Sequence, residues 1–281
     1  MKKYIKEQVT VSTDEHDLKL MILKPTIAKK TTEATPGILW IHGGGYVSGT
    51  ARKIASSRAG DFVKKYGAVV VAPEYRLAGK APYPAALEDC YTALQYLRDH
   101  ADELGCSSDK IMVGGESAGG GLTVALCMYA RDWGDVNIAF QMPLYPMLDD
   151  RDTFSNRSNN SFTWSSKQNR KAWALYLENV VGDPPAYAVP ARQMNYADLP
   201  PAYTFVGDKE IFFSETMRYV DNLKNDGVQA HVDVYPTRIH AFDLTFPFTK
   251  VSKQAIAELE KQYLYAVEHY SAPQTKEEKT F

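Results

Sequence analysis

Short runs of apolar residues alternate along the chain with longer segments in which apolar residues recur every three or four positions. Apolar runs typical of buried strands occupy 37–41, 68–72, 111–113, 138–144 and 201–206, and a further strand is expected over 230–235. Helical spacing is found over 51–66, 85–100, 122–129, 167–177, 213–225 and 251–269. Because strands and helices alternate along the chain, the pattern predicts right-handed crossovers and an α/β fold with a mostly parallel sheet.

The two ends of the chain and one loop depart from this alternation. Residues 5–12 and 18–23 are extended segments around the turn-like stretch 13–16, which predicts an antiparallel hairpin at one edge of the sheet. Residues 26–35 are polar and predict a loop. The polar tail 271–281 is expected to fray.

A segment from about 147 to 198 interrupts the alternation with polar loop residues around one aromatic-rich helix. A long insertion above the C-terminal edge of the sheet is where a small cap or lid would lie. A surface excursion with its own small core explains the aromatic residues Trp164, Trp173 and Tyr176 equally well. No repeat or long linker divides the chain, so we predict a single domain over 1–281 that carries this insertion.

The amino-acid composition limits the kinds of binding partner and the cellular compartment that are expected for this chain. Of 281 residues, 44% are hydrophobic and 23% charged, and the formal net charge of −2 comes without the basic patch that nucleic-acid binding needs. No secretory signal and no run of about eighteen apolar residues is seen, so neither secretion nor membrane spanning is expected. Cys90, Cys106 and Cys127 lack metal-type spacing and are expected to be buried thiols in a reducing cytoplasm.

The stretch Gly115-Glu116-Ser117-Ala118-Gly119 lies between the strand 111–113 and the helix 122–129. It fits G-x-S-x-G, the nucleophile elbow, in which a serine sits on a tight turn that only glycines can flank without a clash. The helix that follows would offer backbone N–H groups to a developing oxyanion. Five such residues also occur by chance in glycine-bearing turns, but the strand before them and the helix after them favour the elbow.

A second motif, His42-Gly43-Gly44-Gly45-Tyr46, follows the strand 37–41. Taken alone, three glycines are typical of a flexible loop. Upstream of a nucleophile elbow, they indicate a backbone that approaches the substrate closely and points N–H groups at it, the second half of an oxyanion hole. The four histidines other than His42 and His240 are scattered without the spacing of ligands, so no metal and no cofactor is expected. They are His16, His100, His231 and His269.

Five motifs together resemble the hormone-sensitive-lipase-like family of α/β-hydrolase esterases over nearly the whole chain. In order, they are His42-Gly-Gly-Gly45, Tyr75-Arg-Leu77, Pro82-Tyr-Pro-Ala-Ala-Leu-Glu-Asp89, Gly115-Glu-Ser-Ala-Gly119, and Tyr235 with His240 and Phe242. The resemblance implies the α/β-hydrolase fold, with a mostly parallel eight-stranded sheet, helices on both faces and a small cap. It also implies hydrolysis of esters with short- to medium-chain acyl groups.

Matched residue by residue, Ser117 takes the place of the family's nucleophile and His240 that of its general base. Gly44, Gly45 and Ala118 match the backbone donors of the oxyanion hole. The chemistry is consistent with these assignments, because serine needs a base to become a nucleophile, and the base needs a carboxylate to fix its tautomer.

The triad acid is the position at which the sequence departs from the family. Members usually carry Asp followed by Pro after this strand, whereas the candidates here are Asp208 and Glu210, which precedes Ile211. Counting back without a gap from 214–216 places Glu210 on the family's Asp, and Glu serves as triad acid in some α/β-hydrolases. We therefore predict Glu210, with Asp208 as the alternative. The elbow also carries Glu116 where Asp is commoner.

These assignments predict a serine carboxylesterase that acts through an acyl-enzyme intermediate on a small-molecule ester. Five aromatic residues in loops beside the motifs are expected to fill much of the cleft: Tyr46, Tyr145, Trp164, Phe212 and Phe242. An amidase or aryl-formamidase would use the same triad, because both reactions pass through a tetrahedral oxyanion. A non-catalytic ligand-binding protein on a hydrolase scaffold is the weaker alternative, since Ser117 and His240 are both present. The oligomeric state stays open, a homodimer included.

Overall fold

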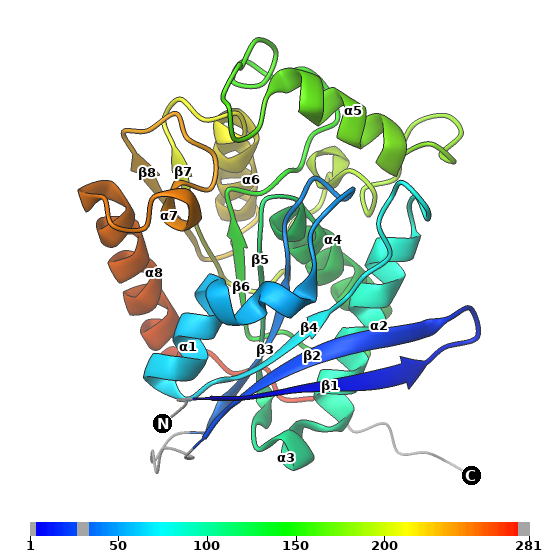
Figure 1. The fold of residues 1–281 in the computed structure, drawn as a ribbon, viewed down its shortest axis with the longest axis vertical. Coiled ribbons are helices and arrows are strands. Elements are labelled where there is room, and N and C mark those ends of the chain that lie inside the picture. Colours follow the sequence, from blue (N-terminus) through cyan, green and yellow to red (C-terminus); the bar gives the residue numbers. More distant parts are fainter. Residues whose placement is uncertain (1–3, 27–33, 275–281) are drawn as a thin grey trace.

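The strands form one eight-stranded sheet in the order β1-β2-β4-β3-β5-β6-β7-β8, in a computed structural model that describes residues 4–26 and 34–274 (Figure 1). Strand β2 pairs antiparallel with β1 and β4, and the remaining pairs are parallel. The strands are β1 (Tyr4–Ser12), β2 (Asp17–Pro25), β3 (Pro36–Ile41), β4 (Val69–Pro73), β5 (Ser107–Glu116), β6 (Phe140–Leu144), β7 (Ala202–Gly207) and β8 (Ala230–Tyr235). The predicted sheet and its antiparallel edge hairpin are confirmed.

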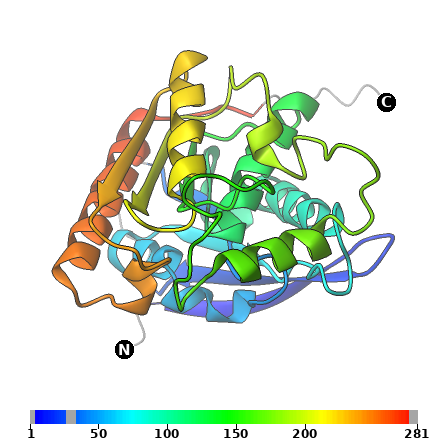
Figure 2. The same ribbon diagram turned by 90° about the horizontal axis from the view of Figure 1, so that it is seen from above.

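Helices cover both faces of this sheet, as Figures 1 and 2 show from two directions. The 3-10 helix η1 (Ala51–Ser56) packs on one face together with α1 (Arg58–Tyr66) and α8 (Lys250–His269). The other face carries α2 (Ala85–Asp99), α4 (Ala118–Trp133) and α6 (Phe213–Asn225). The short elements are α3 (Ala101–Leu104), α5 (Ser166–Tyr176), η2 (Pro190–Arg192) and α7 (Phe242–Thr245). Strands β3, β4 and β6 are buried along their whole length because both of their faces are covered.

The helix expected over 51–66 is in fact two elements. Ser57 between them has an extended backbone (φ −84°, ψ 177°), and its side chain donates to the carbonyl of Ile54 at 2.8 Å. Ala51 and Ile54 before the break and Phe62 after it all point into the core. Apolar spacing therefore persists across the break, which is why the sequence pattern did not reveal it.

The segment 147–198 lies across the end of the sheet at which the parallel strands terminate (Figure 1). Its helix α5 packs onto the domain, because Trp173 and Tyr176 are buried in the same core cluster as residues of α2 and α4. Tyr176 stacks on Tyr46, with ring centroids 4.1 Å apart.

The beginning of the polar tail is held in place, in contrast to the expected fraying. Ala272 donates its backbone N–H to Asp109 at 2.9 Å, and the Gln274 side chain donates to Ser108 at 2.8 Å. Residues 275–281 lie outside the described part of the chain, as do 27–33 of the predicted loop. All three cysteines are buried free thiols, as expected.

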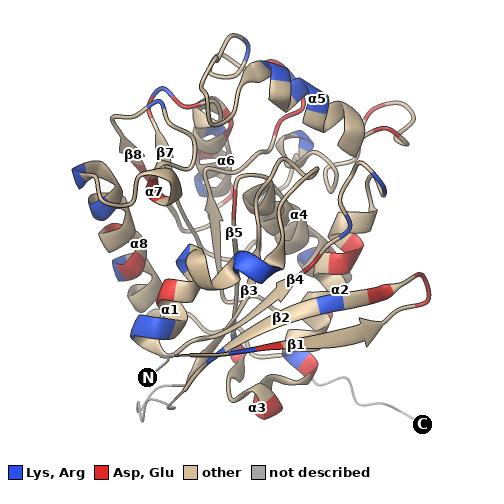
Figure 3. Ribbon diagram, viewed as in Figure 1, with Lys and Arg blue, Asp and Glu red and all other residues tan. Residues whose placement is uncertain are grey.

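Charged side chains of both signs are spread over most elements (Figure 3). Within 4–26 and 34–274, no helix is both long and apolar enough to cross a membrane.

Candidate active site

Ser117 occupies the sharp turn between β5 and α4. Its backbone has φ 58° and ψ −119°, a strained conformation for a residue with a side chain. A Cβ at Gly115 would lie 2.5 Å from the carbonyl oxygen of Ile41, and one at Gly119 would lie 2.1 Å from the same atom. Strand β3 therefore runs so close to the turn that both flanking positions must be glycine, as the motif predicted.

Ser117, His240 and Glu210 form a connected chain of side chains. The Ser117 Oγ lies 2.8 Å from Nε2 of His240, and both carboxylate oxygens of Glu210 lie 3.3 Å from Nδ1 on the other side of the ring. All three side chains are buried, and Glu210 has no exposed surface. The arrangement has the connectivity of a serine triad, with base between nucleophile and acid.

The imidazole of His240 is held by contacts beyond the triad. Its backbone N–H donates to Oγ1 of Thr163 at 3.2 Å. The rings of Tyr145 and Phe212 pack edge-on against it, at centroid distances of 5.2 and 5.0 Å. These contacts restrict the ring to the orientation in which Nε2 faces Ser117.

The structure places the two candidate acids in different environments. Glu210 follows β7 and also accepts the backbone N–H of Phe212 at 3.2 Å, immediately before α6. Asp208 is exposed, and its backbone N–H donates to the carbonyl of Tyr235 at 2.8 Å. Within the described residues, no contact joins the Asp208 side chain to His240, so the geometry favours Glu210.

The glycine loop 43–45 lies beside the elbow. Gly43 approaches it so closely that a Cβ there would be 2.8 Å from the Glu116 carbonyl oxygen. His42 supports the loop through a 2.8 Å hydrogen bond between Nδ1 and the carbonyl of Gly43, and its ring stacks on Tyr75 at 4.2 Å. Burial lowers the pKa of His42, so the neutral ring, with Nδ1 donating, suits this bond.

The three amides expected to form the oxyanion hole, those of Gly44, Gly45 and Ala118, lie on this loop and on the first residue of α4. Gly44 and Gly45 line the cavity next to Ser117. Within the described chain, no acceptor is bonded to the N–H of any of the three. They are therefore available to an oxygen atom of a bound ligand.

Trp164 closes one side of the site. A Cβ at Gly45 would lie 2.3 Å from Cη2 of the Trp164 indole, so the ring lies directly on the glycine loop. The indole Nε1 donates to Oδ1 of Asn169 at 3.3 Å, which ties it to α5.

A cavity of about 610 Å³ opens beside Ser117 and His240. This volume is in the range of small-molecule sites. The glycine loop and Trp164 form one part of its wall, and a second part comes from the η1–α1 segment, including Lys53, Ile54, Ser57 and Arg58. Thr163, Ala241, Leu244 and Pro247 contribute on the side of His240.

Four of the five aromatic residues expected in the cleft are instead part of the core. The exposed fractions of Tyr46, Tyr145, Phe212 and Phe242 are 1%, 0%, 0% and 3%, and none of them lines the cavity. Tyr46 packs under α5, while Tyr145 and Phe212 support His240 and Phe242 packs on Phe205. Trp164 alone among the five lines the cavity, so the expectation was wrong for the others. A loop position beside a motif does not decide whether an aromatic ring faces the cleft or the core.

Sequence reasoning did not identify the η1–α1 wall or Thr163. Lys53, Ser57 and Arg58 belong to no motif, and they reach the cavity because the chain breaks its helix at Ser57. A hydroxyl in a polar loop carries no signal that it meets the backbone of a histidine 77 residues away.

A buried polar cluster reaches the cavity wall through Glu116 and Arg58. Glu116 accepts the indole N–H of Trp40 at 2.9 Å. The Nε of Arg58 lies 3.3 Å from Oδ2 of Asp243, and the hydroxyl of Tyr145 donates to Oδ1 of the same carboxylate at 2.9 Å. Burial raises the pKa of Glu116 to about 8, with the Asp243 carboxylate adding to this rise while Trp40 and Arg58 oppose it. The cluster connects the residue before Ser117 with the segment that follows His240.

We expect Glu116→Gln to change how stability depends on pH. Glutamate in an unfolded chain titrates at about 4.3. Between that pH and about 8, the folded protein retains a proton that the unfolded chain has released, so the free energy of unfolding falls as pH rises. One such group contributes at most about 1.4 kcal/mol per pH unit. Between pH 5.5 and 7.5, the free energy of unfolding measured with urea should therefore fall less for the variant than for the wild-type protein. An equal fall in both proteins would contradict a buried, protonated Glu116.

Known proteins resemble this chain in sequence and in fold. A family model described as alpha/beta hydrolase fold matches residues 38–244. Esterase LipI of Mycobacterium tuberculosis is 33% identical over 222 residues, which cover 74% of this chain and 65% of LipI. Carboxylesterase NlhH of the same organism is 28% identical over 256 residues, which cover 84% of this chain and 75% of NlhH. The chain thus spans slightly less than two thirds of the length of LipI.

Among solved structures, a bacterial heroin esterase superposes with a TM-score of 0.87 at 31% sequence identity. The superposition covers 94% of this chain and 85% of the heroin esterase. The two proteins thus share one fold over almost the whole length of this chain.

Proposed function

The chain belongs to the hormone-sensitive-lipase-like family of the alpha/beta hydrolase fold, and from this premise we propose that it is a serine carboxylesterase for esters with short- to medium-chain acyl groups. The observation that carries the proposal is the 2.8 Å contact between Ser117 Oγ and His240 Nε2, with Glu210 on the far side of the ring and a ligand-sized cavity alongside. The related proteins named above are esterases, which agrees with this chemistry.

In the proposed reaction, Ser117 Oγ attacks the ester carbonyl carbon while its proton passes to Nε2 of His240. The negative charge that develops on the carbonyl oxygen is met by the N–H groups of Gly44, Gly45 and Ala118. His240 then gives the proton to the leaving alcohol, and an acyl-enzyme forms on Ser117. Water then attacks the acyl carbon while its proton passes to Nε2 of His240. His240 returns this proton to Ser117 Oγ as the carboxylic acid product leaves. Glu210 holds Nδ1–H and stabilises the imidazolium in both halves.

The segment 147–198 acts in this proposal as a cap. Trp164 covers the glycine loop, and Thr163 holds the backbone of His240, so the segment both encloses the substrate and positions the base. Exclusion of water by such a cover strengthens every electrostatic contact within the site.

Short acyl groups are expected because one part of the cavity wall carries polar side chains. Arg58, Glu116 and Ser57 line it, and an alkyl chain laid over them would bury polar groups without giving them hydrogen bonds. A p-nitrophenyl ester with a C4 acyl group should therefore have a kcat/KM at least about tenfold above that of the C12 ester, a difference of about 1.4 kcal/mol. Both esters are measured below their aggregation limits. Faster turnover of the C12 ester would contradict the proposed acyl preference.

A further inference from the structure

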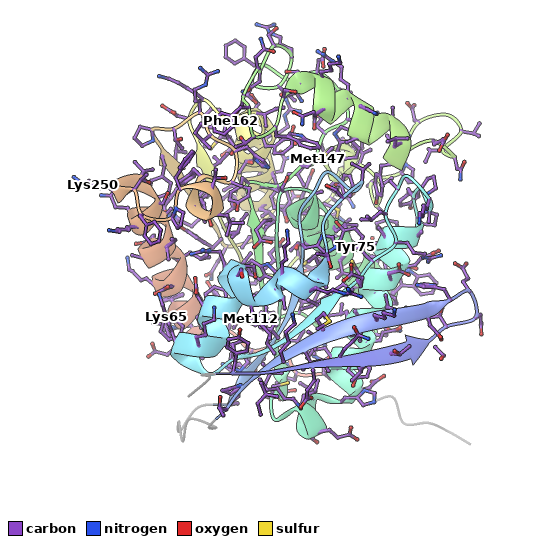
Figure 4. All side chains as sticks on the ribbon, viewed as in Figure 1. Lys65, Tyr75, Met112, Met147, Phe162 and Lys250 are labelled. Atoms are coloured by element: carbon purple, nitrogen blue, oxygen red, sulfur yellow. The ribbon has the colours of Figure 1, made fainter. Side chains whose placement is uncertain are left out.

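Three phenylalanines are exposed next to the cavity on the side of His240. Phe162, Phe246 and Phe248 have exposed fractions of 72%, 45% and 86%; we call them the phenylalanine rim. Single exposed apolar side chains are common on protein surfaces, but adjoining ones next to a cavity typically mark a binding surface. Figure 4 labels Phe162 in the upper part of the molecule, where the parallel strands end.

The rim residues are adjacent in sequence to residues that line the cavity. Phe162 immediately precedes Thr163 and Trp164, both of which line the cavity, and Phe246 and Phe248 flank the lining residue Pro247. The rings of Phe162 and Phe246 meet edge to face, with centroids 6.3 Å apart. Two segments far apart in the sequence therefore bring the rings of Phe162 and Phe246 together, and each segment also supplies residues that line the cavity.

Backbone hydrogen bonds hold both segments of the rim in place. Ser161 donates its N–H to Oδ1 of Asn159 at 3.0 Å, on one side of Phe162, and Thr163 on the other side accepts the N–H of His240. Phe246 donates its N–H to Phe242 at 2.9 Å at the end of α7 and accepts that of Thr249 at 3.2 Å. A surface held in this way loses little conformational freedom when a ligand binds.

The position of the rim relative to the base indicates which part of an ester it would contact. In the proposed reaction the leaving oxygen receives its proton from Nε2 of His240, so the alcohol group must lie on the side of His240. Phe246 and Phe248 belong to the chain segment that follows His240. Phe162 precedes Thr163, whose side chain accepts the backbone N–H of His240. The polar wall formed by Arg58 and Glu116 comes from other elements.

We propose that the phenylalanine rim is the binding subsite for an aromatic or otherwise apolar alcohol group of the substrate. The inference rests on the proposed esterase function and names the substrate class, which is short-chain acyl esters of apolar alcohols. Apolar contact with exposed phenyl rings removes hydrophobic area from water on both partners.

The test compares two acetate esters, 2-naphthyl acetate and ethyl acetate, on the double variant Phe162→Ser/Phe248→Ser. We expect the ratio of kcat/KM for the naphthyl over the ethyl ester to fall about tenfold, because the larger alcohol alone reaches the rim. Phe154→Ser is the matched control, since Phe154 is 81% exposed but lines a separate hollow with Arg157 and Arg238. Its ratio should stay at the wild-type value.

A binding measurement separates this inference from the esterase function. The affinity of 2-naphthol for the Ser117→Ala protein needs no turnover, and adding the two rim substitutions should weaken it about tenfold as well. If the wild-type chain hydrolyses neither ester, the esterase proposal fails, while the naphthol result still decides the rim. Unchanged ester ratio and unchanged naphthol affinity in the rim variant would overturn the inference. A changed sedimentation coefficient of the rim variant, together with an unchanged ratio of kcat/KM for the two esters, would also overturn the inference. That result would assign the rim to a contact between copies of the chain.

Discussion

Ser117→Ala is expected to lower kcat for a p-nitrophenyl ester by about 10⁶, the loss found when the nucleophile of a serine protease is removed. The methyl group of alanine cannot form the acyl-enzyme, so only binding and the oxyanion hole remain to assist attack by water. The elbow should persist, because alanine meets the same constraint at φ 58° and the glycines on either side are unchanged. Thermal unfolding checks that the variant is folded.

Covalent labelling gives a second readout for the same variant. An organophosphonate should label the wild-type chain once and leave the Ser117→Ala chain unlabelled. Ser214→Ala serves as the control, since Ser214 exchanges hydrogen bonds with Ser155 and does not line the cavity. Undiminished labelling of the Ser117→Ala chain would show that another residue is the nucleophile.

The parts of the site that the sequence predicted are those set by local backbone chemistry. Ser117 and its flanking glycines lie within five residues, and the clash that demands those glycines arises from the turn itself together with the adjacent strand. The central strands β3 and β4 could be predicted from continuous apolar runs, because a strand covered on both faces has no polar positions.

Positions decided by packing between distant segments were beyond such reasoning. Whether Tyr145 faces a ligand or supports His240 depends on where the segment after β8 lies, and no local pattern encodes this. The break at Ser57 was hidden because Ile54 and Phe62 keep a helical spacing across it. Phe162 and Phe246 were not recognised as a pair, since 84 residues separate them in the sequence.

Glu210→Gln is expected to lower kcat by about 10⁴, the loss recorded when the carboxylate of a serine-protease triad becomes an amide. The amide side chain would keep the size of the glutamate and an oxygen for the N–H of Phe212, so the packing should survive. Its N–H₂ group, however, can present a donor to Nδ1 of His240. That contact stabilises the tautomer with the proton on Nε2, which cannot accept the proton of Ser117.

Asp208→Asn is the matched control, two residues away at the end of the same strand. Asp208 is exposed, and the hydrogen bond that anchors it, from its backbone N–H to Tyr235, does not involve the carboxylate. A substitution at such a site usually changes free energies by no more than about 0.5 kcal/mol, so kcat should stay within about a factor of two. The two variants are compared by kcat after thermal unfolding shows both to be folded. If the Asp208 variant were the inactive one while the Glu210 variant turned over normally, Asp208 would have to reach His240 in the working enzyme and the assignment of the acid would be reversed.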